Sequence, residues 1–230
     1  MKVFFGVIIG LALAIGVAVA AAYYAFGGIG DLGGRDKSND VMRTIDVTGF
    51  DRIDIAGVYE IDVTVGGDYS VQISGAPSEM EKLDASVSNG ELVLDQDRSK
   101  KTKRSWRNTG LTAVIILPSL SAIDIAGVAD ATVRGVEGDE FRVDLSGVGD
   151  IDVSGTCGRL DADVSGVGEL NARALECRDV DVEVSGIGEA KVYASQSVDA
   201  AVNGIGSISV YGSPENVDKS STFLSSISVK

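Results

Sequence analysis

The sequence predicts an all-β solenoid of stacked coils of about 20 residues each, preceded by one N-terminal transmembrane or signal helix. A Ser-Gly-x-Gly-acidic motif begins at Ser146 and returns at Ser165 and Ser185, and a variant begins at Asn203. Apolar and polar residues alternate on both sides of each copy, as in Val143–Leu145, which is typical of strands with one buried face. The chain has 29 glycines and only 3 prolines, a balance that favours ordered turns over a disordered linker.

Residues 1–26 are predicted to form the transmembrane or signal helix. Lys2 is followed by Val3–Phe26, which carries no charge; as a helix this run extends about 36 Å, enough to cross the ~30 Å hydrocarbon layer. The small residues of Ala18–Ala22 also fit a signal cleavage site, so an uncleaved anchor and a removed signal both stay open. Lys2 precedes the apolar run and Asp31 is the first charge after it, so the N-terminus should stay cytoplasmic and the rest should be exported.

The remainder of the chain divides into a tether and one domain. Residues 27–40 are rich in glycine and polar residues, which predicts a flexible tether. Residues 41–230 are the predicted solenoid. We therefore expect a single-pass cell-membrane protein whose C-terminal domain lies outside the cytoplasm, periplasmic or extracellular. Signal cleavage would instead give a secreted protein.

Alignment of the copies sorts their side chains into columns. One copy cannot bury its apolar face alone, so the coils must stack at the ~4.8 Å spacing of hydrogen-bonded strands. The predicted apolar columns are Leu145, Val164, Val184 and Val202; Val148, Val167, Ile187 and Ile205; and Ile151, Leu170, Ala190 and Ile208. The predicted outward acidic columns are Asp144, Asp163 and Glu183; and Asp150, Glu169 and Glu189.

The acidic columns and the composition limit the chemistry. Stacked carboxylates repel each other, and either a divalent cation or solvent and salt relieve the repulsion; we predict no specific metal site and no cofactor. The net charge of −14 opposes nucleic-acid binding. The chain has no histidine, so Ser146, Ser165 and Ser185 lack the base of a serine hydrolase, and we predict no catalytic residue.

A basic segment interrupts the regular pattern. It spans Arg98–Arg107 and holds six basic residues around one tryptophan, between two strand-like runs. Such a segment either contacts an anionic surface, such as lipid headgroups or an acidic polymer, or is a solvated loop. The candidate contact residues are Arg98, Lys100, Lys101, Lys103, Arg104, Trp106 and Arg107.

The two cysteines fall in nearly equivalent places of adjacent copies. Cys157 and Cys177 are 20 residues apart, and export places them in a compartment that permits disulfides. They form either a disulfide that joins two coils or two buried thiols.

Four further blocks accompany the repeats: Phe50–Ile53, Val71–Gly75, Leu117–Leu120 and Val210–Pro214. Together with the repeats, these blocks resemble the auto-transporter adhesin head GIN domain family of bacteria. The resemblance covers roughly 41–230 and implies a right-handed parallel β-helix-like solenoid in envelope proteins, often behind a signal or lipoprotein anchor. This chain has no lipobox cysteine, and in its last coil Ser225 and Ser226 replace the expected Gly-x-Gly.

These observations favour a membrane-anchored, non-catalytic module of the cell envelope that acts as an adhesin or interaction domain. Its partners would be the membrane, through the N-terminal helix, and a cell-envelope polymer or protein. One alternative is a polysaccharide-active enzyme, because some parallel β-helices cleave polysaccharides. The other is an envelope-sensing accessory protein. The sequence does not predict an oligomeric state.

Overall fold

The computed structural model describes residues 39–97 and 110–230, which belong to one compact unit that begins at Lys37. The predicted N-terminal helix, most of the tether and the basic segment lie outside the described residues. No helix in the described part of the chain has both the length and the apolar character needed to cross a membrane.

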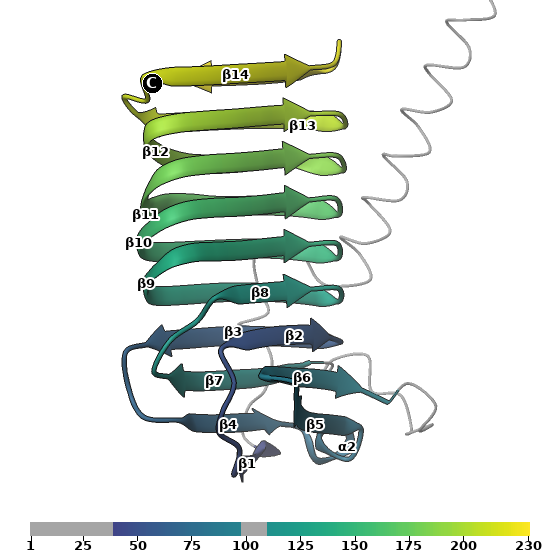
Figure 1. The fold of residues 1–230 in the computed structure, drawn as a ribbon. Helices are drawn as coiled ribbons and strands as arrows, with labels where there is room; N and C mark the ends of the chain where they lie inside the picture. Colours follow the sequence, from purple (N-terminus) through teal and green to yellow (C-terminus); the bar gives the residue numbers. More distant parts are fainter. Residues whose placement is uncertain (1–38, 98–109) are drawn as a thin grey trace, which may run out of the picture. The chain divides into compact units, whose positions relative to one another are not determined.

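The strands of this part form one continuous sheet that winds into a β-solenoid of roughly five turns (Figure 1). Four long strands carry the repeat, and each pairs parallel with the next. Each long strand bends near its middle, so its first half belongs to one wall of the solenoid and its second half to the other. The four are β9 (Val128–Leu145), β10 (Val148–Val164), β11 (Val167–Val184) and β12 (Ile187–Val202).

We call the two walls wall A and wall B. Wall A contains the first halves of the long strands, and wall B contains their second halves. The shorter strands of wall A are β3 (Val58–Val65), β7 (Leu111–Leu117), β13 (Ile205–Gly212) and β15 (Ser225–Val229). Those of wall B are β2 (Arg52–Ala56), β6 (Glu91–Gln96), β8 (Ala122–Ile125) and β14 (Asn216–Ser221).

The N-terminal end of the unit departs from parallel coiling. β4 pairs antiparallel with both β1 and β7, and β5 pairs antiparallel with β6. A one-turn helix, α2, begins at a proline and leads from β4 to β5. The repeat period predicts the parallel coils but not these hairpin-like pairs. The additional elements are β1 (Val41–Ile45), β4 (Ser70–Gly75), α2 (Pro77–Met80) and β5 (Leu83–Ser88).

The core lies between the walls and contains two of the three predicted apolar columns. Leu145, Val164, Val184 and Val202 are all 0% exposed, and so are Ile151, Leu170, Ala190 and Ile208.

The third predicted column is wrong, because its members lie on the outside. Val167 is 36% exposed and Ile205 is 38% exposed. These residues directly follow the Ser-Gly corner. Each stands an odd number of positions before the first buried apolar residue of its strand, as Val148 stands before Ile151 in β10. Successive side chains on a strand point to opposite faces, so this spacing turns them outward.

Candidate functional site

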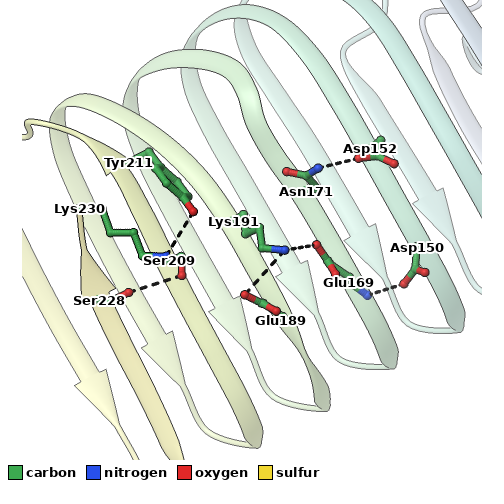
Figure 2. A network of polar contacts seen from close by, with 10 residues as sticks. All are labelled: Asp150, Asp152, Glu169, Asn171, Glu189, Lys191, Ser209, Tyr211, Ser228 and Lys230. Atoms are coloured by element: carbon green, nitrogen blue, oxygen red, sulfur yellow. Dashed lines mark hydrogen bonds and ion pairs between the residues drawn. The ribbon is translucent and has the colours of Figure 1, made fainter.

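The outer face of wall A carries rows of polar side chains that run across the coils (Figure 2). In-register parallel pairing sets equivalent residues of successive coils side by side, so a periodic sequence becomes a periodic surface. We call this set the polar ladder. It consists of Asp150, Asp152, Glu169, Asn171, Glu189, Lys191, Ser209, Tyr211, Ser228 and Lys230.

Members of the polar ladder on β10, β11 and β12 bond to one another across the coils. The backbone amide of Glu169 donates to Asp150 Oδ1 at 3.0 Å, and Asn171 Nδ2 donates to Asp152 Oδ1 at 2.7 Å. Lys191 Nζ lies 2.5 Å from Glu169 and 3.8 Å from Glu189. The hydrogen bond to Glu169 is the main reason that the pKa of Lys191 is raised.

Toward the C-terminal coils the chemistry of this face changes. The predicted acidic column, Asp150–Glu169–Glu189, is confirmed by the strand register, but serines replace carboxylates in the next two coils. Here Tyr211 lies beneath two cations: the Arg173 guanidinium is 4.2 Å and the Lys230 amine 5.1 Å from its ring centre. Lys230 Nζ also donates to the Tyr211 hydroxyl at 3.3 Å.

Wall B presents a longer run of carboxylates. The predicted column of Asp144, Asp163 and Glu183 is confirmed, and the register extends it through Asp124 to Asp54. Burial, followed by the charges of Asp144 and Glu183, raises the pKa of Asp163, and its Oδ1 has no hydrogen-bond partner. Burial is also the leading cause of the raised pKa values of Asp54 and Asp124.

A second column of aspartates, which contains Asp181, Asp199 and Asp218, borders an open hollow of about 540 Å³ on the C-terminal half of wall B. Arg159 pairs with Asp181 at 3.0 Å. Ser197 donates a hydrogen bond of 2.5 Å to Asp179, which, with Arg178 beside it, lowers the pKa of that carboxyl. The hollow is lined by Arg159, Asp179, Asp181, Ser197, Asp199 and Asp218, among others.

In the part of the chain that the structure describes, the polar residues of these faces follow the repeat of the coils. In the described ranges, no three His, Cys, Asp or Glu side chains are grouped so that they could hold a metal ion. The repeated serines lie at corners, where the amides of Ser165 and Ser185 each donate to the preceding coil at 3.0 Å. Burial is the first cause of the raised aspartate pKa values, and nearby carboxylates add to it. The arrangement offers paired charges, hydroxyls and amides to a binding partner.

The two cysteines lie in register in the bends of β10 and β11, with their Cα atoms 4.5 Å apart, and a disulfide joins them. Cys177 is buried at 1% exposure. The same column holds Gly138 in β9 and Ala194 in β12. The disulfide therefore connects two coils at a position where the neighbouring coils have small side chains.

The predicted anionic-surface contact at Arg98–Arg107 lies outside the described residues and stays a prediction. Sequence reasoning missed the cationic and aromatic part of wall A. A signal was present, because Tyr193 and Tyr211 are 18 residues apart, the same step that separates the last two Gly-x-Gly motifs.

Comparison with known proteins identifies a family model that matches residues 49–214, described as "Putative auto-transporter adhesin, head GIN domain". A solved structure titled as a putative adhesin from Bacteroides fragilis is 28% identical, with a TM-score of 0.70 over 84% of this chain and 98% of that one. A putative lipid binding protein from Parabacteroides distasonis is 21% identical, with a TM-score of 0.47 over 84% and 97%. A putative adhesin from Parabacteroides merdae is 15% identical, with a TM-score of 0.49 over the same shares. No curated protein matches the chain.

Proposed function

The chain belongs to the head GIN domain family, and from this premise we propose that it is a non-catalytic, adhesin-like interaction module of the cell envelope. The observation that carries the proposal is the polar ladder, in which equivalent side chains repeat from coil to coil and pair with one another. Such a surface suits an extended partner, such as an envelope polymer, because polar side chains stand at the same position in each successive coil. The similarity to an adhesin-titled structure at 28% identity adds support.

The arrangement of the acidic residues favours binding over polysaccharide cleavage. A glycosidase pair needs two carboxylates with different roles, one kept protonated and one ionised, set by different environments. On wall A the carboxylates instead repeat in similar environments, as Asp130 and Asp150 do: burial raises both pKa values, and the next carboxylate in the column adds to the effect. Beside the hollow of wall B the directions differ, because hydrogen bonds with Ser197 and Arg178 lower the pKa of Asp179 while burial raises that of Asp181.

The location follows from two features of the chain. The apolar run Val3–Phe26 supports membrane anchoring with the solenoid exported, and the Cys157–Cys177 disulfide fits an oxidising compartment. In this setting the basic segment Arg98–Arg107 is a second candidate contact, directed at anionic lipid or polymer. An envelope-sensing role would need a membrane partner and has no further support from the described surfaces.

A binding and hydrolysis comparison tests the proposal. The full chain, reconstituted in lipid nanodiscs, is screened on a glycan array and against purified envelope polysaccharides, with release of new reducing ends measured in parallel. We expect binding without product. We also expect Lys191→Gln combined with Tyr211→Ala to weaken binding by at least about tenfold, because charged and aromatic residues dominate interface energies.

The matched control is Arg159→Gln, which removes a half-exposed cation from wall B rather than wall A. An equal loss of binding in the two variants would show that the polar ladder is not the binding surface. Release of sugar products, or no binding to any polymer, would contradict the function itself.

A further inference from the structure

The outer face of wall A holds a guanidinium group that no carboxylate of the described chain neutralises. Arg173 lies on β11 and is exposed. Across residues 39–97 and 110–230 it forms no ion pair, and its guanidinium donates no hydrogen bond. The next arginine of the same strand, Arg178, is 2.8 Å from Asp179. In place of an acidic partner, Arg173 has the Tyr211 ring, 4.2 Å from its guanidinium carbon.

A β-bulge in β11 directs this side chain across the coils. The bend of β11 contains three residues, 173–175, that no residue of β12 opposes. Toward β10 the pairing passes from Asn171 directly to Ala174. Extra residues of this kind re-aim a side chain and are frequent beside functional sites. From the bulge the side chain of Arg173 crosses β12 and reaches Tyr211 on β13.

The Tyr211 ring fixes the guanidinium in place without neutralising it. A cation over an aromatic face is attracted by the ring quadrupole, but its full charge remains. An arginine head group is a planar fork of N–H donors that matches a carboxylate with two parallel hydrogen bonds. The contact therefore prepares Arg173 to receive an anion from outside the chain, and Tyr211 is its positioning residue.

The carboxylate column of wall A ends at the strand that this guanidinium reaches. Ser207 on β13 stands opposite Glu189 on β12, and Ser226 on β15 stands opposite Ser207. Over β10, β11 and β12 an anionic ligand meets the repulsion of the column. Over β13 it meets serine and the free cation. The local field thus favours an anionic group at this place on a chain whose net charge is −14.

The tyrosines next to the guanidinium favour a sugar as the carrier of that anion. Tyr193 and Tyr211 stand in register on adjacent coils, and both are partly exposed. Tyrosine offers an apolar ring with a polar tip, against which the C–H face of a sugar ring packs while sugar hydroxyls bond to neighbouring polar groups. A phosphodiester chain without rings would use the cation but not the tyrosines.

We propose that the C-terminal part of wall A binds an acidic polysaccharide, with Arg173 on the carboxylate of a uronate unit. This assignment rests on the proposed function and names the class of polymer that the polar ladder binds. Tyr211 holds the guanidinium over β13, and Tyr193 extends the contact to the sugar rings.

A matched pair of polymers tests the class of ligand. Polygalacturonate carries a carboxylate on each sugar, and its fully methyl-esterified form keeps the backbone without the charge. The full chain in nanodiscs of neutral lipid should bind polygalacturonate at least about tenfold more tightly than the ester, because charge-assisted hydrogen bonds add to the contact. Added NaCl should narrow the difference.

The two proposals fail in different ways. Equal affinities for the acid and the ester, or binding of neither while another polymer binds, would overturn the uronate assignment alone. No binding to any polymer would contradict the proposed function as well. A poly(glycerol phosphate) chain that binds as tightly as polygalacturonate and depends equally on Arg173 would overturn the choice of a carboxylate.

Single variants test the role of Arg173. Arg173→Gln should reduce the affinity for polygalacturonate to about that for the ester and leave binding of the ester unchanged. The matched control is Arg178→Gln, which removes the same charge from the same strand at a position already paired with Asp179. Equal losses in the two variants would indicate a general charge effect and overturn the site.

A double-mutant cycle tests the role of Tyr211. Tyr211→Leu removes the ring that positions the guanidinium, so Arg173→Gln should cost less affinity in this background than in the wild-type chain. Tyr211→Phe keeps the ring face and should retain the binding of polygalacturonate. Strictly additive losses would contradict the positioning role, and unchanged melting temperatures would show that the variants fold.

Discussion

At the scale of single residues, the corner glycines set how closely the coils approach. Gly147, Gly166, Gly186 and Gly204 follow one another along the stack, and each lies against the backbone of the glycine one coil earlier. A Cβ on any of these four would come within 3.0 Å of that neighbour's carbonyl oxygen. The requirement is therefore one of space, imposed by the strand spacing.

Gly166→Ala should destabilise the protein by at least about 1–3 kcal/mol, because its methyl group overpacks rigid backbone that cannot move away. Thermal and urea unfolding measure the change. Gly138→Ala is the control, since the nearest atom to its added Cβ, Glu140 O, is 3.7 Å away. Similar stability losses in the two variants would show that the close approach at the corner is not what requires glycine.

The sequence predicts which side chains are buried where a strand alternates regularly, and it fails at the corners between strands. Leu145 and Ile151 follow from alternation alone, but Val148 does not, because the Ser-Gly corner between them resets which face each residue takes. The contact of Arg173 with Tyr211 was also beyond prediction. It joins residues 38 positions apart and depends on an irregularity in the pairing of β11 with β12 after Ala172.

At the scale of elements, the disulfide restrains two coils that hydrogen bonds already hold. It connects β10 to β11 across 20 residues. Closing a loop of this size restricts the unfolded chain, an effect of about 3 kcal/mol in the chain-entropy model.

The double variant Cys157→Ser, Cys177→Ser should therefore unfold at lower temperature, with a loss of about 3 kcal/mol. A thiol reductant should lower the melting temperature of the wild-type protein and leave the double variant unchanged. Thiol counting on the unfolded, unreduced protein should find no free thiol. Two free thiols per chain would refute the disulfide and the stability argument together.

Strand pairing separates what sequence can predict from what it cannot. Strands β10 to β13 repeat, so their partners follow from the period. The alternation in β4 predicts a strand but gives no partner. Its pairing with β7 joins segments about 40 residues apart, and no copy elsewhere in the chain marks that contact. The antiparallel end of the unit therefore became visible only in the structure.

At the scale of the whole molecule, the columns turn a net charge of −14 into lines of like charge. Burial, followed by the nearest carboxylates, raises the pKa of Asp163 and of Asp181. The pKa values of Asp54, Asp124, Asp130 and Asp150 are raised as well, with burial as the first cause of each.

The directions of these pKa shifts determine whether the stability of the fold rises or falls with pH. A carboxyl whose pKa is higher in the folded state binds its proton more tightly there, so its contribution favours folding below the ordinary value of 3.8 and is lost as pH rises through the raised value. The melting temperature should therefore rise as pH falls from 7 toward 4, and added NaCl should raise it at pH 7 by screening.

Asp163→Asn should flatten this pH profile and raise stability at pH 7, because it removes the charge that lies between Asp144 and Glu183 in the wall B column. Asp68→Asn, in the exposed turn between β3 and β4, is the control. A melting temperature that falls steadily from pH 7 to pH 5, or that does not change when NaCl is added, would contradict the repulsion between stacked carboxylates.

The disulfide also has a mechanical consequence. A pull on the C-terminal coil loads the parallel ladders one hydrogen bond at a time, so the solenoid peels from β15 and β14 inward, coil after coil. Peeling proceeds through β13 and β12 and reaches β11, where the covalent link to β10 stops the two coils from separating. The residues between Cys157 and Cys177 therefore cannot be extended by the pull, and the load passes through the disulfide to the coils that precede Cys157.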